Sequence, residues 1–210
     1  MFSTVYRLVM NGVPVFINCK VIRMDDEKGD KHIVIGVSNV DSQMRREQEL
    51  TVAQERANKD PLTGVKSKHA FDDAEAEWNV HISKGEAGEF AIAVCDVNGL
   101  KEINDTLGHK AGDVHIQKAC SRICKVFQHS PVYRIGGDEF AAILSGQDYE
   151  KKDELMALMQ AKNEAGEDGG IKVACGIAEL SQVEDKSFVS VFKKADAAMY
   201  ENKRQLKGIS

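Results

Sequence analysis

Several features are absent from this 210-residue chain, and each absence excludes a class of protein. No apolar run approaches the roughly 20 residues that a membrane-spanning helix needs, and the start lacks a basic segment followed by a long apolar stretch. Positive charge is not in excess either, because 28 Lys and Arg face 33 Asp and Glu. A general electrostatic attraction to nucleic acid or anionic lipid is therefore disfavoured. We expect a cytoplasmic protein with no membrane insertion and no nucleic-acid partner.

Cysteine also lacks an informative pattern. The five cysteines are odd in number and contain no Cys-x-x-Cys spacing, which argues against a disulfide framework or a zinc site. We expect them to be reduced core residues. With 42% hydrophobic and 29% charged residues, the chain has the composition of a soluble globular protein, and its length suits one domain plus a smaller segment.

Residues 1–40 alternate in the manner of β-strands, and the first two strand-like runs flank Asn11-Gly12. This dipeptide supports the positive φ angles of a tight hairpin turn, so an antiparallel meander is predicted. Three strands bury too little surface to fold alone, and we expect this segment to be the end of a larger module. Residues 41–59 are rich in charge and helix formers and predict a helical linker. Its apolar seam is short, so a coiled coil and a solvated connector helix both fit.

Residues 60–210 predict a second domain, which begins where Pro61 prevents the helix from continuing. A buried strand is expected at 90–96, followed by a helix whose apolar residues recur at helical spacing between Ile116 and Phe127. Two strand-like runs then flank Gly136-Gly137, and a helix, a strand and a final helix follow. The order β-α-β-β-α-β predicts an α+β fold. We expect a mainly antiparallel sheet of the split βαβ type with helices packed on one side.

Acidic residues fall at the ends of two of these predicted strands. Asp96 ends one strand, and Asp138-Glu139 follow the Gly136-Gly137 turn of another, so the fold can bring three carboxylates to one edge. Such carboxylates repel one another unless a divalent cation relieves them, and oxygen-only ligands favour Mg²⁺ or Mn²⁺ together with substrate phosphates. A solvated hairpin tip of the same composition fits the spacing equally well.

Five stretches carry a resemblance to a known family, and they occur in that family's order. They are Asp60–Gly64 (DPLTG), Asp96–Asp105 (DVNGLKEIND), Leu107–Asp113 (LGHKAGD), Arg134–Phe140 (RIGGDEF) and Ala195–Tyr200 (ADAAMY). Together they resemble the motifs of GGDEF domains, the diguanylate cyclases, over about 150 residues. This resemblance implies the sheet of nucleotidyl cyclases and polymerase palms. More weakly, residues 1–40 and their linker resemble the last strands of a PAS sensor domain.

The resemblance implies that two GTP molecules are condensed into cyclic di-GMP with release of two pyrophosphates. Each domain supplies half of the active site, so the active species is expected to be a homodimer, transient or induced. Mg²⁺ or Mn²⁺, two ions per site, would be held by the Asp96 carboxylate, the Val97 carbonyl and Asp138. Glu139 would be a further ligand or contact a metal-bound water. Asp138 matches the proton acceptor, a role that a metal-bound water also fits.

The remaining site positions are implied by the same resemblance. Lys101 would stabilise charge on the phosphates, although an ordinary exposed lysine also fits that position. Asn104 and Asp113 would recognise guanine, and because adenine lacks the N1 and N2 donor pair, ATP would be rejected. Four further substrate contacts are expected: His109, which also fits a helix cap, Lys203 at a phosphate, Arg134 near the site, and Leu100 in a base pocket where Phe is common.

Several residues depart from the family pattern. Asn98 replaces a second acid, but strand alternation turns it away from the metal position. Lys207 stands where Arg is frequent, which gives up a bidentate phosphate contact. Phe127 and Ser130 replace the Arg-x-x-Asp pair of product-inhibited members, so feedback at that site is expected to be absent.

Two other functions remain open. One is a catalytically inactive GGDEF domain that binds GTP or cyclic di-GMP as a regulatory module. Such a domain typically loses its acids, whereas Asp96, Asp138, Glu139 and Lys101 are all present, which favours catalysis. The other is a related cyclase acting on a different nucleotide, which Asn104 with Asp113 opposes.

Overall fold

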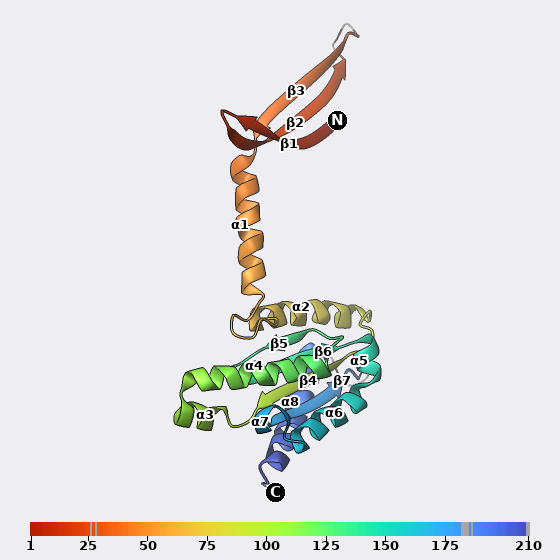
Figure 1. Cartoon of the computed structure of the whole chain (residues 1–210). Coiled ribbons are helices and arrows are strands. Elements are labelled where there is room, and N and C mark those ends of the chain that lie inside the picture. Colours follow the sequence, from red (N-terminus) through yellow and green to blue (C-terminus); the bar gives the residue numbers. More distant parts are fainter. Residues whose placement is uncertain (26, 28, 182–184, 186, 209–210) are drawn as a thin grey trace. The chain divides into compact units, whose positions relative to one another are not determined.

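The computed structural model describes residues 1–25, 27, 29–181, 185 and 187–208 (Figure 1). Contacts divide the chain into two compact units, Met1–Arg56 and Ala57–Ser210. Among the described residues, no helix has both the length and the apolar character needed to cross a bilayer.

The first unit contains an antiparallel meander and one helix. Strands β1 (Phe2–Met10), β2 (Val13–Asp25) and β3 (Lys31–Asn39) pair in the order β1-β2-β3. At the first turn Asn11 and Gly12 have φ angles of 51° and 79°, the left-handed values that this dipeptide tolerates. The predicted meander is therefore confirmed. Helix α1 (Asp41–Ala57) follows, and none of its residues is buried.

The second unit is built on a sheet of four strands with the order β5-β6-β4-β7, in which every neighbouring pair is antiparallel. The strands are β4 (Ala91–Val97), β5 (Val132–Arg134), β6 (Glu139–Leu144) and β7 (Val173–Glu179). The α+β fold with a mainly antiparallel sheet is confirmed. Strand β4 pairs with β6 on one side and with the outer strand β7 on the other, so it lies inside the sheet. The loop that follows β4 leads to α3.

The prediction that helices pack on one side of the sheet was wrong, because they cover both faces. On one face, Ile116, Ile123 and Met159 pack against Ala93 and Cys95. On the other face, apolar residues of α2 and α8 pack against the alternate positions Ile92 and Val94 of the same strand. All seven residues of β4 are buried, so both faces of this strand need a cover. The helices are α2 (Lys68–Lys84), α3 (Leu100–Leu107), α4 (His109–Val126), α5 (Gly146–Glu150), α6 (Lys152–Glu164), α7 (Glu167–Gly170) and α8 (Phe188–Leu206).

Helix α8 lies very close to β7 at Gly176. A Cβ atom on this glycine would lie 2.6 Å from the Ala198 carbonyl carbon, and closer still to the Met199 nitrogen and the Ala195 oxygen. Only a residue without a side chain permits this approach. The contact fixes the height of α8 above the sheet, and with it the position of the basic residues near the end of that helix. All five cysteines are free thiols, and Cys95, Cys120 and Cys175 are buried as predicted, whereas Cys19 and Cys124 are only partly buried.

Candidate functional site

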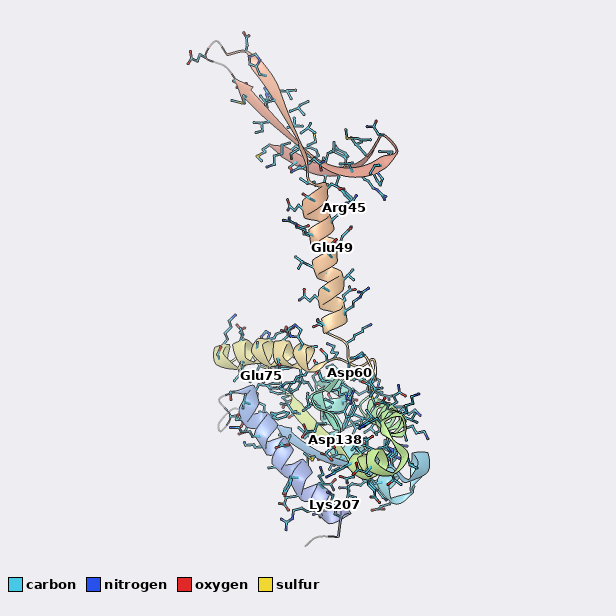
Figure 2. The ribbon with its side chains drawn as sticks, turned by 90° about the vertical axis from the view of Figure 1, so that its left-hand side faces the viewer. Arg45, Glu49, Asp60, Glu75, Asp138 and Lys207 are labelled. Atoms are coloured by element: carbon cyan, nitrogen blue, oxygen red, sulfur yellow. The ribbon has the colours of Figure 1, made fainter. Side chains whose placement is uncertain are left out.

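A cavity of about 570 Å³ opens at the carboxyl end of β4. The strand, the loop after it, α3, the turn before β6 and the end of α8 all contribute to its wall. The lining residues are Asp96, Val97, Asn98, Gly99, Leu100, Lys101, Glu102, Asp105, Thr106, Asp138, Lys203 and Lys207. Figure 2 labels Asp138 beside the sheet and Lys207 just beyond α8. The cavity therefore joins Asp96 and Asp138, which the sequence predicted as partners, with three lysines.

Asp96 is the most buried acid of this group, at 4% exposure. One carboxylate oxygen, Oδ2, accepts a hydrogen bond from Lys203 Nζ at 2.6 Å. The other, Oδ1, is buried and has no hydrogen-bond partner among the described residues. An unpaired buried acceptor is unfavourable, so this oxygen is free to accept a ligand such as a cation.

The strand register brings the acids to one face of the sheet. Asp96 lies opposite Glu139 in the β4–β6 pairing, so both side chains project toward the face that α8 covers. The Val97 N–H donates to the Asp138 carbonyl at 2.9 Å, which holds the turn against the end of β4. Burial, followed by the charges of Asp138 and Asp96, raises the pKa of Glu139 above its ordinary value.

These acids are neighbours without forming a closed cluster. Within the described part of the chain, no group of three or more His, Cys, Asp or Glu side chains is assembled at metal-ligating distance. Lys203 instead neutralises Asp96 directly. The Asp96–Lys203 pair thus supplies the balancing positive charge that the sequence alone assigned to a divalent ion.

The Gly136-Gly137 turn is shaped by its own hydrogen bonds. The Ile135 and Gly136 N–H groups both donate to the Glu139 carbonyl, at 2.9 and 3.2 Å. A Cβ atom on Gly136 would lie 2.6 Å from Glu139 Oε2, so a side chain there would displace the Glu139 carboxylate, whereas Gly137 meets nothing within 4 Å among the described residues. A side chain would therefore be crowded at Gly136 and would make no contact at Gly137.

The other predicted site residues lie around the cavity without lining it. Arg134 donates to the Gly137 carbonyl and to Asp60, so it braces the turn from outside the described lining. Asn104 packs over Gly112, where a Cβ atom would lie 2.9 Å from Asn104 Cγ. His109 and Asp113 are exposed on α4. The structure therefore places the predicted guanine-recognising residues Asn104 and Asp113 on α3 and α4, outside the residues that line the cavity.

Sequence reasoning missed several residues of this site. Glu102, Asp105 and Thr106 line the cavity from α3, and their spacing on one helical face was a usable signal. The Asn98 N–H donates to the Lys172 carbonyl at 2.9 Å, which anchors the loop after β4. Asp60, the partner of Arg134, is 74 positions away from it, and no local pattern indicates such a pair.

A family model described as diguanylate cyclase, GGDEF domain, matches residues 57–208. The chain belongs to this family. The match begins at the boundary between the two units, and the PAS-like character of residues 1–40 stays a prediction.

Two curated relatives come from Pseudomonas aeruginosa. The diguanylate cyclase DgcP is 30% identical over 157 residues, which cover 71% of this chain and 23% of DgcP. The diguanylate cyclase TpbB is 32% identical over 174 residues, covering 79% of this chain and 40% of TpbB. This chain therefore spans less than half of the length of either relative.

A solved structure of Caulobacter crescentus DgcB, comprising its coiled coil and GGDEF domain in complex with c-di-GMP, has a TM-score of 0.65. It shares 29% sequence identity, and the alignment covers 78% of this chain and 90% of that one. The similarity extends the family assignment from sequence to three-dimensional structure.

Proposed function

We propose that this GGDEF domain condenses two GTP molecules into cyclic di-GMP and releases two pyrophosphates. The observation that carries the proposal is the cavity in which Asp96, in β4, and Asp138, in the turn before β6, meet Lys101, Lys203 and Lys207. Acids and lysines around one cavity suit a triphosphate that binds together with a cation. The lysines would balance the negative charge of the phosphates, and the acids would balance the positive charge of the cation. Two GTP molecules must react with each other and each domain is proposed to bind one, so the proposed active species is a homodimer with a GTP in each half.

The donor set suits a hard divalent cation. Asp96 has a buried carboxylate oxygen without a partner, and Asp138 lines the same cavity. The Asp96 and Asp138 carboxylates and the Val97 carbonyl would hold Mg²⁺ or Mn²⁺, two ions per site, with Glu139 as a further ligand or a contact to bound water. When bound, the metal would neutralise the phosphates and activate the attacking 3′-hydroxyl.

The chain's own residues then have separate tasks. Lys203 would exchange its bond to Asp96 for one to a phosphate oxygen, while Lys101 and Lys207 hold the triphosphate from the rim. Asp138 would accept the proton of the 3′-hydroxyl at a carboxylate oxygen. Leu100 would pack against the base, with His109 as a further contact.

Guanine selectivity is assigned to α3 and α4. The Asn104 amide would contact the ring edge of guanine, and the Asp113 carboxylate would accept from its N1 and N2 hydrogens. With ATP these groups stay unpaired, which costs about 1–3 kcal/mol, or roughly 5- to 150-fold in selectivity.

The test is incubation of the whole chain with GTP and Mg²⁺, scored for cyclic di-GMP and pyrophosphate over a range of protein concentrations. We expect product from GTP, roughly 5- to 150-fold less from ATP, and a specific activity that rises with protein concentration. Asp138→Ala is expected to lose at least about 100-fold in rate. Asp72→Ala is the matched control, because Asp72 is an exposed acid on α2 that pairs with Lys68.

A second candidate function is a regulatory domain that binds GTP or cyclic di-GMP without catalysis. The Asp96–Lys203 ion pair favours it, since a lysine already balances the acid that a metal would need. Binding of GTP without any product at high protein concentration, in the presence of Mg²⁺ or Mn²⁺, would establish this function and refute catalysis.

A further inference from the structure

We infer that Asp60 and Arg134 form a positioning pair that holds the turn carrying Asp138, which makes the loop of residues 58–67 a functional part of the active site. This inference rests on the proposed function for its kinetic consequences. Its structural consequence, a turn held by a distant ion pair, is testable without any activity.

Arg134 is the centre of the arrangement. Its Nη1 donates to both carboxylate oxygens of Asp60, at 3.2 and 3.3 Å. Its Nη2 and Nε donate to the Gly137 carbonyl oxygen, at 2.6 and 3.2 Å. The guanidinium is planar and rigid, so these bonds fix the carbonyl relative to the carboxylate. A lysine has a single nitrogen and cannot make both sets of contacts in the same geometry.

The Gly137 carbonyl belongs to the peptide that joins Gly137 to Asp138. The next carbonyl, that of Asp138, accepts from the Val97 N–H at 2.9 Å. Gly137 itself has no side chain and meets no described atom within 4 Å of a Cβ position. The Cβ position of Gly137 therefore makes no packing contact, and the hydrogen bonds from Arg134 add a side-chain restraint on this peptide to the backbone bonds of the turn. The orientation of the Asp138 side chain follows from the orientation of the peptide that precedes it.

Asp60 is a rigid anchor for the other end of the arginine. Its Oδ1 accepts hydrogen bonds from the Thr63 N–H at 2.9 Å and the Thr63 hydroxyl at 2.6 Å. The backbone closes the same loop, with Asp60 N–H donating to Val65 and Gly64 N–H donating to Asp60, both at 2.8 Å. Figure 2 labels Asp60 and Asp138 within the same unit.

The loop is also attached to the sheet next to the turn. The Lys66 N–H donates to the Val132 carbonyl at 3.1 Å, and the Arg134 N–H donates to the Lys66 carbonyl at 2.8 Å. The Asp60 and Arg134 side chains are each only 16% exposed, so water screens their interaction less than that of a surface pair. The hydrogen bonds of Arg134 thus link the position of this loop to the position of Asp138.

The kinetic test compares Arg134→Lys, Arg134→Gln and Asp60→Asn with the unmodified chain. Since the pair orients a group that acts in the transition state, we expect kcat to fall at least about tenfold while the GTP concentration for half-maximal rate changes little. Arg134→Lys keeps the charge and is expected not to rescue kcat. Because the two residues act as one unit, the Asp60→Asn, Arg134→Gln double variant is expected to reduce kcat by no more than the more damaging of the two single variants does.

Hydrogen exchange of the 135–140 segment supplies the readout that is independent of catalysis. We expect faster amide exchange there in each Arg134 variant and in Asp60→Asn, and no change in Lys68→Gln, which breaks an exposed ion pair with Asp72. Asp60→Asn is nearly isosteric and keeps the acceptor for Thr63, so it reports even where an arginine variant fails to fold.

Unchanged exchange in Asp60→Asn, or full kcat in Arg134→Lys, would overturn the inference. If the unmodified chain makes no cyclic di-GMP, the proposed function fails while the exchange measurement still decides whether the pair holds the turn.

Discussion

Replacing Gly176 by alanine tests how closely α8 must approach the sheet for the site to form. The new Cβ atom would lie 2.6 Å from the Ala198 carbonyl carbon, whereas ordinary contacts of this kind begin at 3.4 Å. The obstructing atoms belong to the helix backbone, so no side chain can rotate away. Helix α8 would have to move by roughly 1 Å, because overpacking of this kind is relieved by backbone shifts.

The magnitude follows from that displacement. Overpacking of a well-packed core costs about 1–3 kcal/mol, and we expect the upper part of this range because the clash is with backbone. For a domain of this size, each kcal/mol lowers Tm by about 2–4 °C, so a decrease of roughly 4–12 °C is expected in thermal unfolding followed by circular dichroism. Since α8 also carries Lys203, the bond to Asp96 is expected to lengthen together with the loss of stability.

Gly137→Ala is the matched control, because it adds the same methyl group where nothing described lies within 4 Å. Its free energy of unfolding is expected to stay within about 0.5 kcal/mol of that of the unmodified chain. Equal Tm values for Gly176→Ala and Gly137→Ala would refute the close packing of α8 on β7.

Three further predictions concern charge and feedback. Burial raises the pKa of Asp60, but hydrogen bonds from Thr63 and Arg134 outweigh it and hold that pKa below its ordinary value of 3.8. The stability that this group contributes is complete above that pH and is lost as pH falls below about 4, so acid unfolding of Asp60→Asn is expected to begin from a lower stability and to be less steep. Lys203→Met removes the ammonium group that competes with a metal ion for Asp96. Without nucleotide, Mn²⁺ titrations followed by electron paramagnetic resonance are expected to show about tenfold tighter binding in Lys203→Met than in the control Lys193→Met. Equal affinities of the two variants would contradict this competition. Because Phe127 is buried in the core and Ser130 is uncharged, added cyclic di-GMP is expected to leave the maximal rate unchanged, and non-competitive inhibition would disprove this.

Local pattern determined most of the secondary structure. The spacing of Ile116, Ala119 and Ile123 predicted α4, and these residues are buried as expected. The Asn11-Gly12 dipeptide predicted a tight hairpin turn, which the left-handed φ angles bear out. These predictions succeed because helix and strand periodicity, and the steric freedom of a turn residue, depend only on neighbours along the chain.

The number of helical layers could not be predicted from such local patterns. The apolar run that forms β4 was identified as a buried strand, but an unbroken apolar run does not say which helices cover its two faces. The packing of α2 and α8 on the second face therefore appeared only in the folded structure.

The candidate site divides in the same way. The sequence placed Asp96 and Asp138 at strand ends, since both lie in short motifs whose chemistry is local. It did not reveal that Lys203 bonds to Asp96 or that Asp60 bonds to Arg134, pairs separated by 107 and 74 positions. Charged side chains carry no periodic signal of their distant partners, so the order of strands in the sheet and the closeness of α8 decided which charges meet.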